Sequence, residues 1–340
     1  MHSTKKLIAL VLVLGVVLTL AAAGAMAAGE RKLVIYSAVY DDETHGLCER
    51  FEEISGIKTS CVVLGGGEIL ARVQNENKNA TASVWFGGPA DPFITAKKQG
   101  LLLQYKSPNA APIAEKYKDP DNYWTGVYIG YVGFVCNNER LKELGIKAPE
   151  SWADLLDPKL KGEIKMASPA ASSTGYVILA TVLQLMGEEK GFEYMGNLDK
   201  NILEYTTRGG GCITDVIAGE IAVGICFCHD AITQQLNGYG DLLTVNVPKE
   251  GTGYETGAMA IIANGPDQAE AKEFYDWALT ADCQNLYKKY GALQFLTAPG
   301  AETHKAVARI ADAKTISYNT AWAGDHKEEF TSKWAAITNR

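Results

Sequence analysis

The chain has 340 residues, of which 32 are Lys or Arg and 40 are Asp or Glu, so its formal net charge is −8. This acidic balance excludes nucleic acid as the expected partner, because neutralising phosphates requires clustered basic side chains. The length exceeds what one hydrophobic core usually serves, so we expect two lobes.

Residues 1–27 have the three parts of a secretory signal peptide. Lys5 and Lys6 precede the apolar run LIALVLVLGVVLTLAAAGA, and AMA at 25–27 has the small-x-small pattern that signal peptidase requires. The alternative is a retained membrane anchor, since the run is long enough to span a bilayer. Its Ala/Gly-rich end and the absence of a following basic cluster favour cleavage after Ala27. No cysteine stands at that point, so we expect an exported periplasmic chain that is not a lipoprotein.

The first part of the exported chain alternates strands and helices. KLVIYSAVY predicts a buried strand, residues 43–55 a helix and KTSCVVLG a second strand; EILARVQNENKN and ASVWFGG then continue with a helix and a strand. Such alternation indicates a parallel sheet with crossover helices.

Seven cysteines in an exported chain suggest disulfide bonding. Cys48 lies in the first predicted helix and Cys61 in the strand that follows it. A helix that returns into an adjacent strand brings these two residues close, so we expect a Cys48–Cys61 disulfide. The sequence does not pair the other five.

Two extended segments are candidates for crossings between the lobes. GVYIGYVGFVCNN (126–138) is rich in β-branched and aromatic residues, and LLTVNVPKEGTGYETGAMAIIANG (242–265) mirrors it as a return crossing. Two lobes joined by such a hinge enclose a cleft that can close around a ligand. The expected division is lobe 1 at 28–130 and 258–300, lobe 2 at 131–257 and C-terminal helices at 301–340.

Three Gly- or hydroxyl-rich loops each precede a predicted helix: LGGGEIL (64–70), SPAASSTGY (168–176) and TTRGGGCITD (206–215). A helix N-terminus presents unpaired N–H groups and the positive end of the macrodipole, so it binds anions. Helix capping explains any one such loop. Three in one exported chain favour an anion site, and none ends in the Gly-Lys-Ser/Thr of nucleotide hydrolases. The candidate contacts are Gly66, Gly67, Ser172, Ser173, Thr174, Arg208, Gly209 and Gly210, with the Arg208 guanidinium suited to phosphate or carboxylate.

The stretch GICFCHDAITQQ (224–235) holds two cysteines, a histidine and an aspartate within five positions. On a predicted strand Cys226 and Cys228 face one way and His229 the other, which disfavours a nucleophilic Cys–His pair. Zinc sites use wider spacings and a second Cys/His pair, which this sequence lacks, so we expect no metal and no cofactor. We interpret the cysteines as small core residues or bridge partners. His229 and Asp230 either cap the next helix or face the cleft.

Aromatic residues flank the predicted crossings and strand ends. Tyr36 and Ser37 end the first strand, and Trp85 lies in the later strand ASVWFGG. Open α/β sheets place ligand contacts beyond the carboxyl ends of their strands. We therefore include Tyr36, Ser37, Trp85 and, on the return crossing, Tyr254 among the candidate ligand contacts.

The order of motifs resembles the extracellular solute-binding proteins of ABC importers, in the ferric-iron-binding branch. The matching segments are VIYSAVYDD, SVWFGGPADPFITAKKQGLL, ESWADLLDPKLKG, ASPAASSTGY, GEIAVGICFCHD, EGTGYETGAMAII and KKYGALQFLTAPGA, within residues 31–305. The resemblance implies an α/β, two-lobed periplasmic binding protein fold of type II with two hinge crossings and an interlobe ligand cleft. It also implies a receptor rather than an enzyme, which captures a small anionic solute for an ABC permease in the inner membrane. We expect a monomer.

The stretch GICFCHDAITQQ (224–235) bears on which ligand is bound. Iron-binding members of this branch coordinate the metal with a Tyr-Tyr pair, which this sequence lacks, and ferric iron favours such hard oxygen donors. His229-Asp230 and the later Glu255 instead resemble the hexose-phosphate-binding subgroup. There a Ser on the first loop, a His-Asp pair and a Glu hold sugar hydroxyls, which assigns Ser37, His229, Asp230 and Glu255. Cys226 and Cys228 depart from that pattern.

Three functions therefore remain open. The first is a periplasmic receptor for a sugar phosphate or a similar small organic anion. The second is a receptor of the same fold for ferric iron, a phosphonate, thiamine or a polyamine. The third is an exported hydrolase, although the chain has neither G-x-S-x-G nor H-E-x-x-H.

Overall fold

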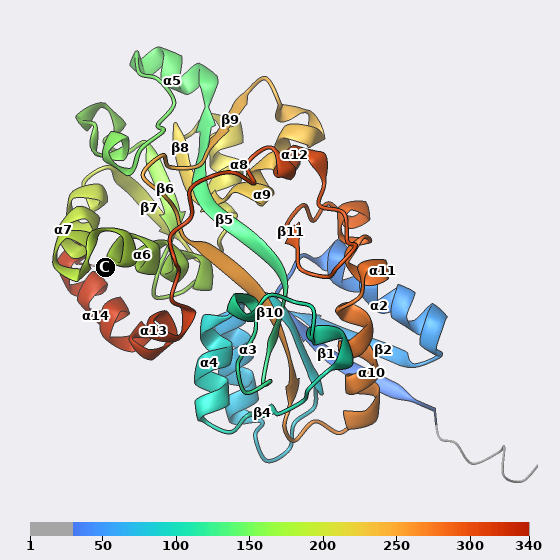
Figure 1. Cartoon of the computed structure of the whole chain (residues 1–340). Coiled ribbons are helices and arrows are strands. Elements are labelled where there is room, and N and C mark those ends of the chain that lie inside the picture. The colour runs from blue at the N-terminus through green and yellow to red at the C-terminus, as the bar shows by residue number, and fades with distance from the viewer. Residues whose placement is uncertain (1–29, 340) are drawn as a thin grey trace, which may run out of the picture.

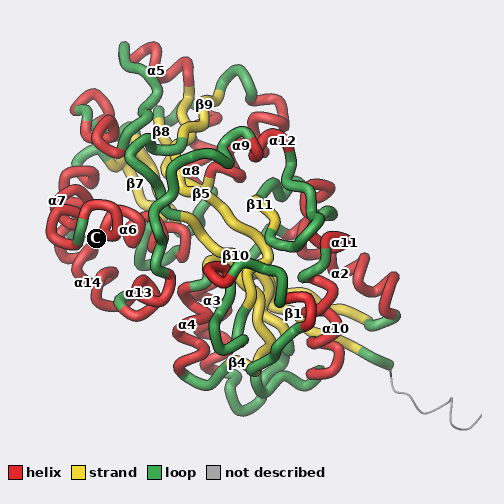
Figure 2. The backbone as a smooth tube through the Cα atoms, viewed as in Figure 1, coloured by secondary structure: helices red, strands yellow, loops and turns green. Residues whose placement is uncertain are grey.

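In the computed structural model, which describes residues 30–339, two α/β bodies meet along a pair of long strands (Figure 1). Strands lie inside each body and helices outside (Figure 2). The strand order is β2 (Lys58–Val63), β1 (Lys32–Ser37), β3 (Val84–Pro89), β10 (Tyr254–Ile262), β5 (Thr125–Asn137), β8 (Val223–Phe227), β6 (Ile164–Ala167) and β7 (Ile202–Thr206). The signal peptide expected at 1–27 lies outside the described residues. In residues 30–339 no helix has the length and apolar character needed to cross a membrane.

Lobe 1 is the lower body in Figure 1. Its parallel strands are β1 (Lys32–Ser37), β2 (Lys58–Val63) and β3 (Val84–Pro89). Its helices are α2 (Asp41–Ser55), α3 (Gly66–Asn75), α4 (Asp91–Lys98), α10 (Gln268–Ala278) and α11 (Ala281–Gln284), and two short strands, β4 (Leu102–Leu103) and β11 (Phe295–Leu296), complete it. Phe51, Phe86 and Phe274 pack edge to face in its core.

Lobe 2 is the upper body. Its strands are β6 (Ile164–Ala167), β7 (Ile202–Thr206), β8 (Val223–Phe227) and β9 (Leu243–Asn246). Its helices are α5 (Asn138–Leu144), α6 (Ser173–Met186), α7 (Glu188–Asp199), α8 (Gly211–Ala218) and α9 (Cys228–Gln234). Buried Trp152 packs edge to face on Phe134 at 5.2 Å between ring centroids, at the centre of this second core.

The two predicted crossings are long antiparallel strands. β5 (Thr125–Asn137) pairs with β10 (Tyr254–Ile262) as far as Tyr131, and from Val132 onward it pairs with β8 and β9. β10 returns to pair with β3. This confirms the two-lobed α/β fold with two crossings. We propose that the lobes divide where β5 changes partners, at the expected 130/131 position, and near the start of β10, slightly before the expected 257/258.

The C-terminal segment contacts both lobes. It contains α12 (Lys305–Ala308), α13 (Thr320–Asp325) and α14 (Lys327–Thr338). The Tyr176 hydroxyl of α6 donates to the Ala323 carbonyl, while Lys327 Nζ lies 2.5 Å from Asp91 Oδ2 at the start of α4. These helices tie lobe 2 to lobe 1, while the division of the chain at residue 301 stays a prediction.

Cys48 and Cys61 form the predicted disulfide, which joins α2 to β2. Cys136, Cys212, Cys226, Cys228 and Cys283 are buried free thiols. Because the bridge closes a loop with a sequence separation of 13 residues, it restricts the unfolded chain. Replacing both bridged cysteines with alanine should lower the free energy of unfolding by at least about 2 kcal/mol, measured by urea denaturation. If a reducing agent lowers the free energy of unfolding of the double variant as much as that of the wild type, this account is wrong.

Candidate functional site

A cavity of about 440 Å³ lies between the lobes. The carboxyl ends of the parallel strands in both lobes point to it, because the last residues of β3, the loops that follow β1, β2, β6 and β7, and the first turn of α9 after β8 all contribute to its wall. Eleven of the residues predicted from sequence line it: Gly66, Gly67, Ser172, Ser173, Thr174, Arg208, Gly209, Gly210, His229, Asp230 and Glu255.

One end of the cavity consists of three helix N-termini. The loops before α3, α6 and α8, which are far apart in sequence, meet there. A Cβ atom added at Gly66 would lie 3.3 Å from Ser173 Oγ, and one added at Gly209 would lie 2.2 Å from Thr174 Oγ1. The Ser173 hydroxyl is buried and has no hydrogen-bond partner. Unpaired N–H groups, a free hydroxyl and the aligned helix dipoles make this end suited to an anion.

The other end of the cavity carries ionisable side chains. His229 Nε2 lies 3.4 Å from Asp230 Oδ1 and 3.8 Å from Glu255 Oε1, and His229 Nδ1 has no hydrogen-bond partner. The imidazole stacks on Phe227 with 5.7 Å between ring centroids. Space for it comes from Gly130 of β5, where an added Cβ would lie 2.5 Å from the ring.

Burial controls the protonation of this end. Desolvation lowers the pKa of His229, and the charge of Asp230 partly opposes that change. Desolvation also raises the pKa of Glu255 well above its ordinary value, and the nearby carboxylate of Asp230 adds to the rise. A neutral imidazole and a protonated carboxyl both donate and accept hydrogen bonds, which suits hydroxyl groups.

The predicted strand through His229 is wrong. β8 ends at Phe227 and α9 begins at Cys228, so His229 and Asp230 lie in the first helical turn. Cys226 remains on β8 in the core, and Cys228 is buried against Leu293 and Val307. The cysteines therefore do not contribute to the cavity wall, whereas the helical turn directs the next two side chains into it.

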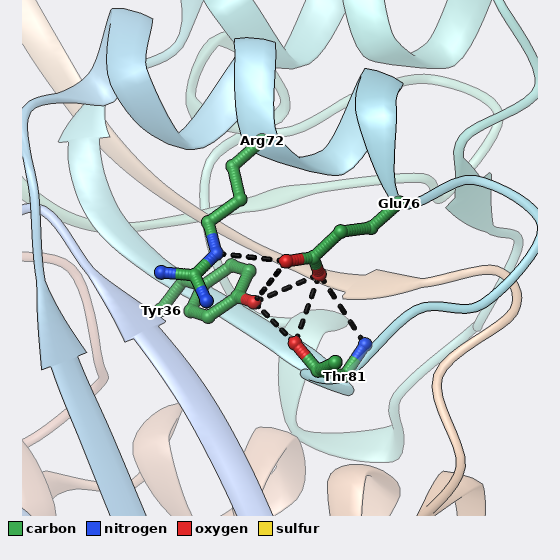
Figure 3. Close-up of polar contacts among 4 residues, drawn as sticks. All are labelled: Tyr36, Arg72, Glu76 and Thr81. Atoms are coloured by element: carbon green, nitrogen blue, oxygen red, sulfur yellow. Dashed lines mark hydrogen bonds and ion pairs between the residues drawn. The ribbon is translucent and has the colours of Figure 1, made fainter.

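Tyr36 does not line the cavity, contrary to the prediction. Its hydroxyl hydrogen-bonds the Glu76 carboxylate at 2.8 Å and lies against Thr81, and the Arg72 guanidinium stacks 4.6 Å from the ring centroid (Figure 3). Ser37, the next residue, does not line the cavity either, because it is fully buried and its hydroxyl bonds Thr44 Oγ1 at 2.7 Å.

Trp85 and Tyr254 are likewise corrected to core residues. Trp85 is fully buried and stacks on Phe93 at 4.1 Å between ring centroids. Tyr254 packs against Tyr117 and Tyr318, on the opposite face of β10 from Glu255. Adjacent strand residues face opposite ways, so only one of the Tyr254-Glu255 pair reaches the cavity.

Several lining residues were missed from the sequence. Tyr128 of β5 reaches the cavity, and its hydroxyl accepts a hydrogen bond from the Gly88 N–H at 2.9 Å. Tyr40, at the N-cap of α2, and Gln294 also line it. Tyr40 follows the first strand in AVYDD, so an aromatic residue at a strand-to-helix turn was the available signal.

Comparison with known proteins places the chain among binding proteins. Residues 90–316 match the family described as bacterial extracellular solute-binding protein. The periplasmic binding protein AfuA from Actinobacillus pleuropneumoniae, with exogenous fructose-6-phosphate bound, is 38% identical with a TM-score of 0.86, covering 92% of this chain and 99% of AfuA.

Two relatives by sequence extend the comparison. An uncharacterised protein of Haemophilus influenzae is 37% identical over 333 residues, which cover 94% of this chain and 96% of the relative. A putative 2-aminoethylphosphonate-binding periplasmic protein of Salmonella typhimurium is 30% identical over 177 residues, covering 52% of this chain and 50% of the relative. The chain thus belongs to the bacterial extracellular solute-binding proteins, the periplasmic components that deliver small solutes to ABC permeases.

Proposed function

We propose that this protein is a monomeric periplasmic receptor that captures a phosphorylated sugar or a similar small organic anion and has no catalytic role. Export would follow cleavage after Ala27, without lipid attachment. The observation that carries the proposal is that one cavity is lined by two sets of groups with different chemistry, the three helix N-termini and the cluster of His229, Asp230 and Glu255. The bound fructose-6-phosphate of the AfuA relative supports the sugar phosphate.

The phosphate would lie at the end formed by α3, α6 and α8. Its oxygens would accept hydrogen bonds from backbone N–H groups near Gly66 and Gly209 and from the unpartnered Ser173 hydroxyl. Arg208 is exposed at the rim of this end, where its guanidinium would add a charge-assisted bond. The Glu68 carboxylate nearby is engaged in accepting the Gly65 N–H at 2.7 Å.

The sugar hydroxyls would lie at the end formed by His229, Asp230 and Glu255. Asp230 accepts hydrogen bonds, and the neutral forms of His229 and Glu255 donate and accept them. These neutral forms are poor partners for a trivalent cation, and the chain lacks a Tyr-Tyr pair, so ferric iron fits less well. A 2-aminoethylphosphonate remains the second candidate, because its ammonium group would pair with Asp230 while its phosphonate occupies the helix N-termini.

Thermal denaturation with added ligands tests the proposal. Fructose 6-phosphate, 2-aminoethylphosphonate, ferric citrate and inorganic phosphate are compared as ligands. A specific ligand at about one hundred times its dissociation constant should stabilise the protein by about 2.7 kcal/mol. We expect the largest shift with the sugar phosphate. No shift with any phosphate ester, together with a red tyrosinate-to-iron absorption band, would overturn the proposal.

Two variants test which residues contact the sugar and which contact the phosphate. Asp230→Ala should weaken sugar phosphate binding more than inorganic phosphate binding, because Asp230 contacts only the sugar. Arg208→Ala should weaken both ligands, inorganic phosphate at least as much. Equal losses of both ligands in Asp230→Ala would show that Asp230 does not contact the sugar. Titration calorimetry gives both affinities directly.

A further inference from the structure

Tyr128 forms part of the cavity wall at the strands that join the lobes. It lies on β5 and pairs directly with Gly257 of β10. A Cβ atom added at Gly257 would lie 2.1 Å from Tyr128 Cζ, so the ring lies across β10 in space that only a glycine leaves free. Beyond β10 the ring reaches β3, where its hydroxyl accepts the Gly88 N–H at 2.9 Å. Contacts with β10 and β3 therefore hold this side chain in one position.

The Tyr128 side chain lies beside the residues that we assign to the sugar. Tyr128 and Gly130 are two residues apart on β5, so they share one face of the strand. A Cβ atom added at Gly130 would meet His229 and Glu255 on that face. The Tyr128 ring itself lies edge to face with the His229 imidazole, at 6.4 Å between ring centroids. The phenol therefore belongs with this set of groups rather than with the helix N-termini.

The phenolic proton of Tyr128 is not used within the part of the chain that the structure describes. The oxygen accepts the Gly88 N–H, and no residue in 30–339 accepts a hydrogen bond from this hydroxyl. Burial raises the pKa of Tyr128 well above its ordinary value, and the charge of Glu255 adds to the rise, so the group stays protonated at neutral pH. Tyr128 is 3% exposed, and a buried donor without an acceptor is costly. An acceptor atom on the ligand would remove that cost.

We propose that Tyr128 is a specificity-determining residue whose phenolic O–H donates to an oxygen of the sugar. This inference rests on the proposed function and deepens it, because it says which organic anions fit. The Asp230 carboxylate accepts hydrogen bonds, whereas Tyr128 has its oxygen engaged by Gly88 and offers a donor. Sugar hydroxyls both donate and accept, so they satisfy both groups. An ammonium group has no acceptor, so 2-aminoethylphosphonate would leave the Tyr128 proton unpaired.

Titration calorimetry on the wild type and Tyr128→Phe, with fructose 6-phosphate, 2-aminoethylphosphonate and inorganic phosphate as probes, tests this inference. Tyr128→Phe should weaken fructose 6-phosphate binding about 3- to 10-fold, since one net hydrogen bond is worth roughly that factor. The affinities for the other two probes should fall less than about twofold. Equal weakening of all three probes would show that the hydroxyl only holds Gly88 in place. That result, or unchanged binding of fructose 6-phosphate, would overturn the inference.

Tyr194→Phe provides the matched control. Tyr194 is a buried tyrosine of lobe 2 whose hydroxyl donates to the Trp152 carbonyl at 2.7 Å, and it lies outside the cavity wall. Both variants should lose thermal stability, because each deprives one buried backbone group of its partner, but Tyr194→Phe should keep the wild-type affinities.

The wild type alone tests the proposed function on which this inference rests. If the wild type binds no fructose 6-phosphate, the assignment to a sugar phosphate fails, and the role of Tyr128 fails with it. If the wild type binds fructose 6-phosphate and Tyr128→Phe binds it equally well, only the role of Tyr128 fails. The two failures are therefore distinguished by one set of titrations.

Discussion

Replacing Gly130 with alanine should weaken fructose 6-phosphate binding on the order of 100-fold in a protein that still folds. A Cβ atom at this position would lie 2.5 Å from His229 Cε1, 2.7 Å from His229 Nδ1 and 2.8 Å from Glu255 Oε1. The imidazole cannot retreat, because Phe227 stacks on it and it is 6% exposed. The methyl group must therefore displace both side chains from the cavity. Losing two hydrogen bonds of this kind gives the expected factor.

Gly126→Ala provides the matched control. It lies on the same strand, β5, and its added Cβ would come equally close to a neighbour, 2.5 Å from Thr256 Cγ2. Neither Gly126 nor Thr256 lines the cavity. Both variants should lose stability, measured by thermal denaturation, but only Gly130→Ala should lose affinity in titration calorimetry. Equal affinities in the two variants would show that His229 and Glu255 do not hold the ligand.

Replacing Glu43 with glutamine should stabilise the ligand-free protein by roughly 3 to 4 kcal/mol at pH 8, and this gain should shrink to below about 1 kcal/mol at pH 5. Glu43 of α2 is fully buried, and neither carboxylate oxygen has a hydrogen-bond partner. Burial, together with the charge of Asp230, raises its pKa from 4.5 to about 8, and the side chain of Gln294 partly opposes the rise. The folded chain therefore binds this proton more tightly than the unfolded chain does.

The sign of the pH dependence follows from this difference. The contribution of the Glu43 proton to the free energy of unfolding is fully present below the pKa of Glu43 in the unfolded chain. It falls by about 1.4 kcal/mol per pH unit as the pH rises from there toward the pKa of Glu43 in the folded chain. The lowered pKa of His229 acts in the opposite direction, but only below its unfolded value of 6.5. Above that pH, wild-type stability should fall while Glu43→Gln falls less steeply.

Urea denaturation between about pH 6.5 and pH 8 measures this difference. Glu49→Gln, at an exposed position on the same helix, is the control that should behave as the wild type does. Parallel pH profiles for the wild type and Glu43→Gln would contradict the assignment of a protonated Glu43.

Local sequence patterns were sufficient to predict much of this molecule. The Cys48–Cys61 disulfide follows from a helix that returns into the next strand. The crossings follow from runs of β-branched and aromatic residues, and β5 indeed spans 13 residues. The three glycine- and hydroxyl-rich loops line one cavity because parallel strands bring their carboxyl ends to the same edge.

The direction of individual side chains was harder to predict. In Tyr254-Glu255 only the second residue faces the cavity, and a one-residue uncertainty in register exchanges the two faces of a strand. The apolar Cys226 and Phe227 also gave no sign that the strand ends at Phe227 and that His229 is helical. The raised pKa of Glu43 depends on its burial and on the charge of Asp230, which lies far away in the sequence, so no local pattern records it.

The most direct test of the central claim is a crystal structure of the protein with fructose 6-phosphate. The account predicts the phosphorus at the N-termini of α3, α6 and α8, near Gly66, Ser173 and Gly209. It predicts sugar hydroxyls within hydrogen-bond distance of Asp230 and Glu255. A ligand bound in the reverse orientation, with its phosphate at the carboxylate end, would contradict the account.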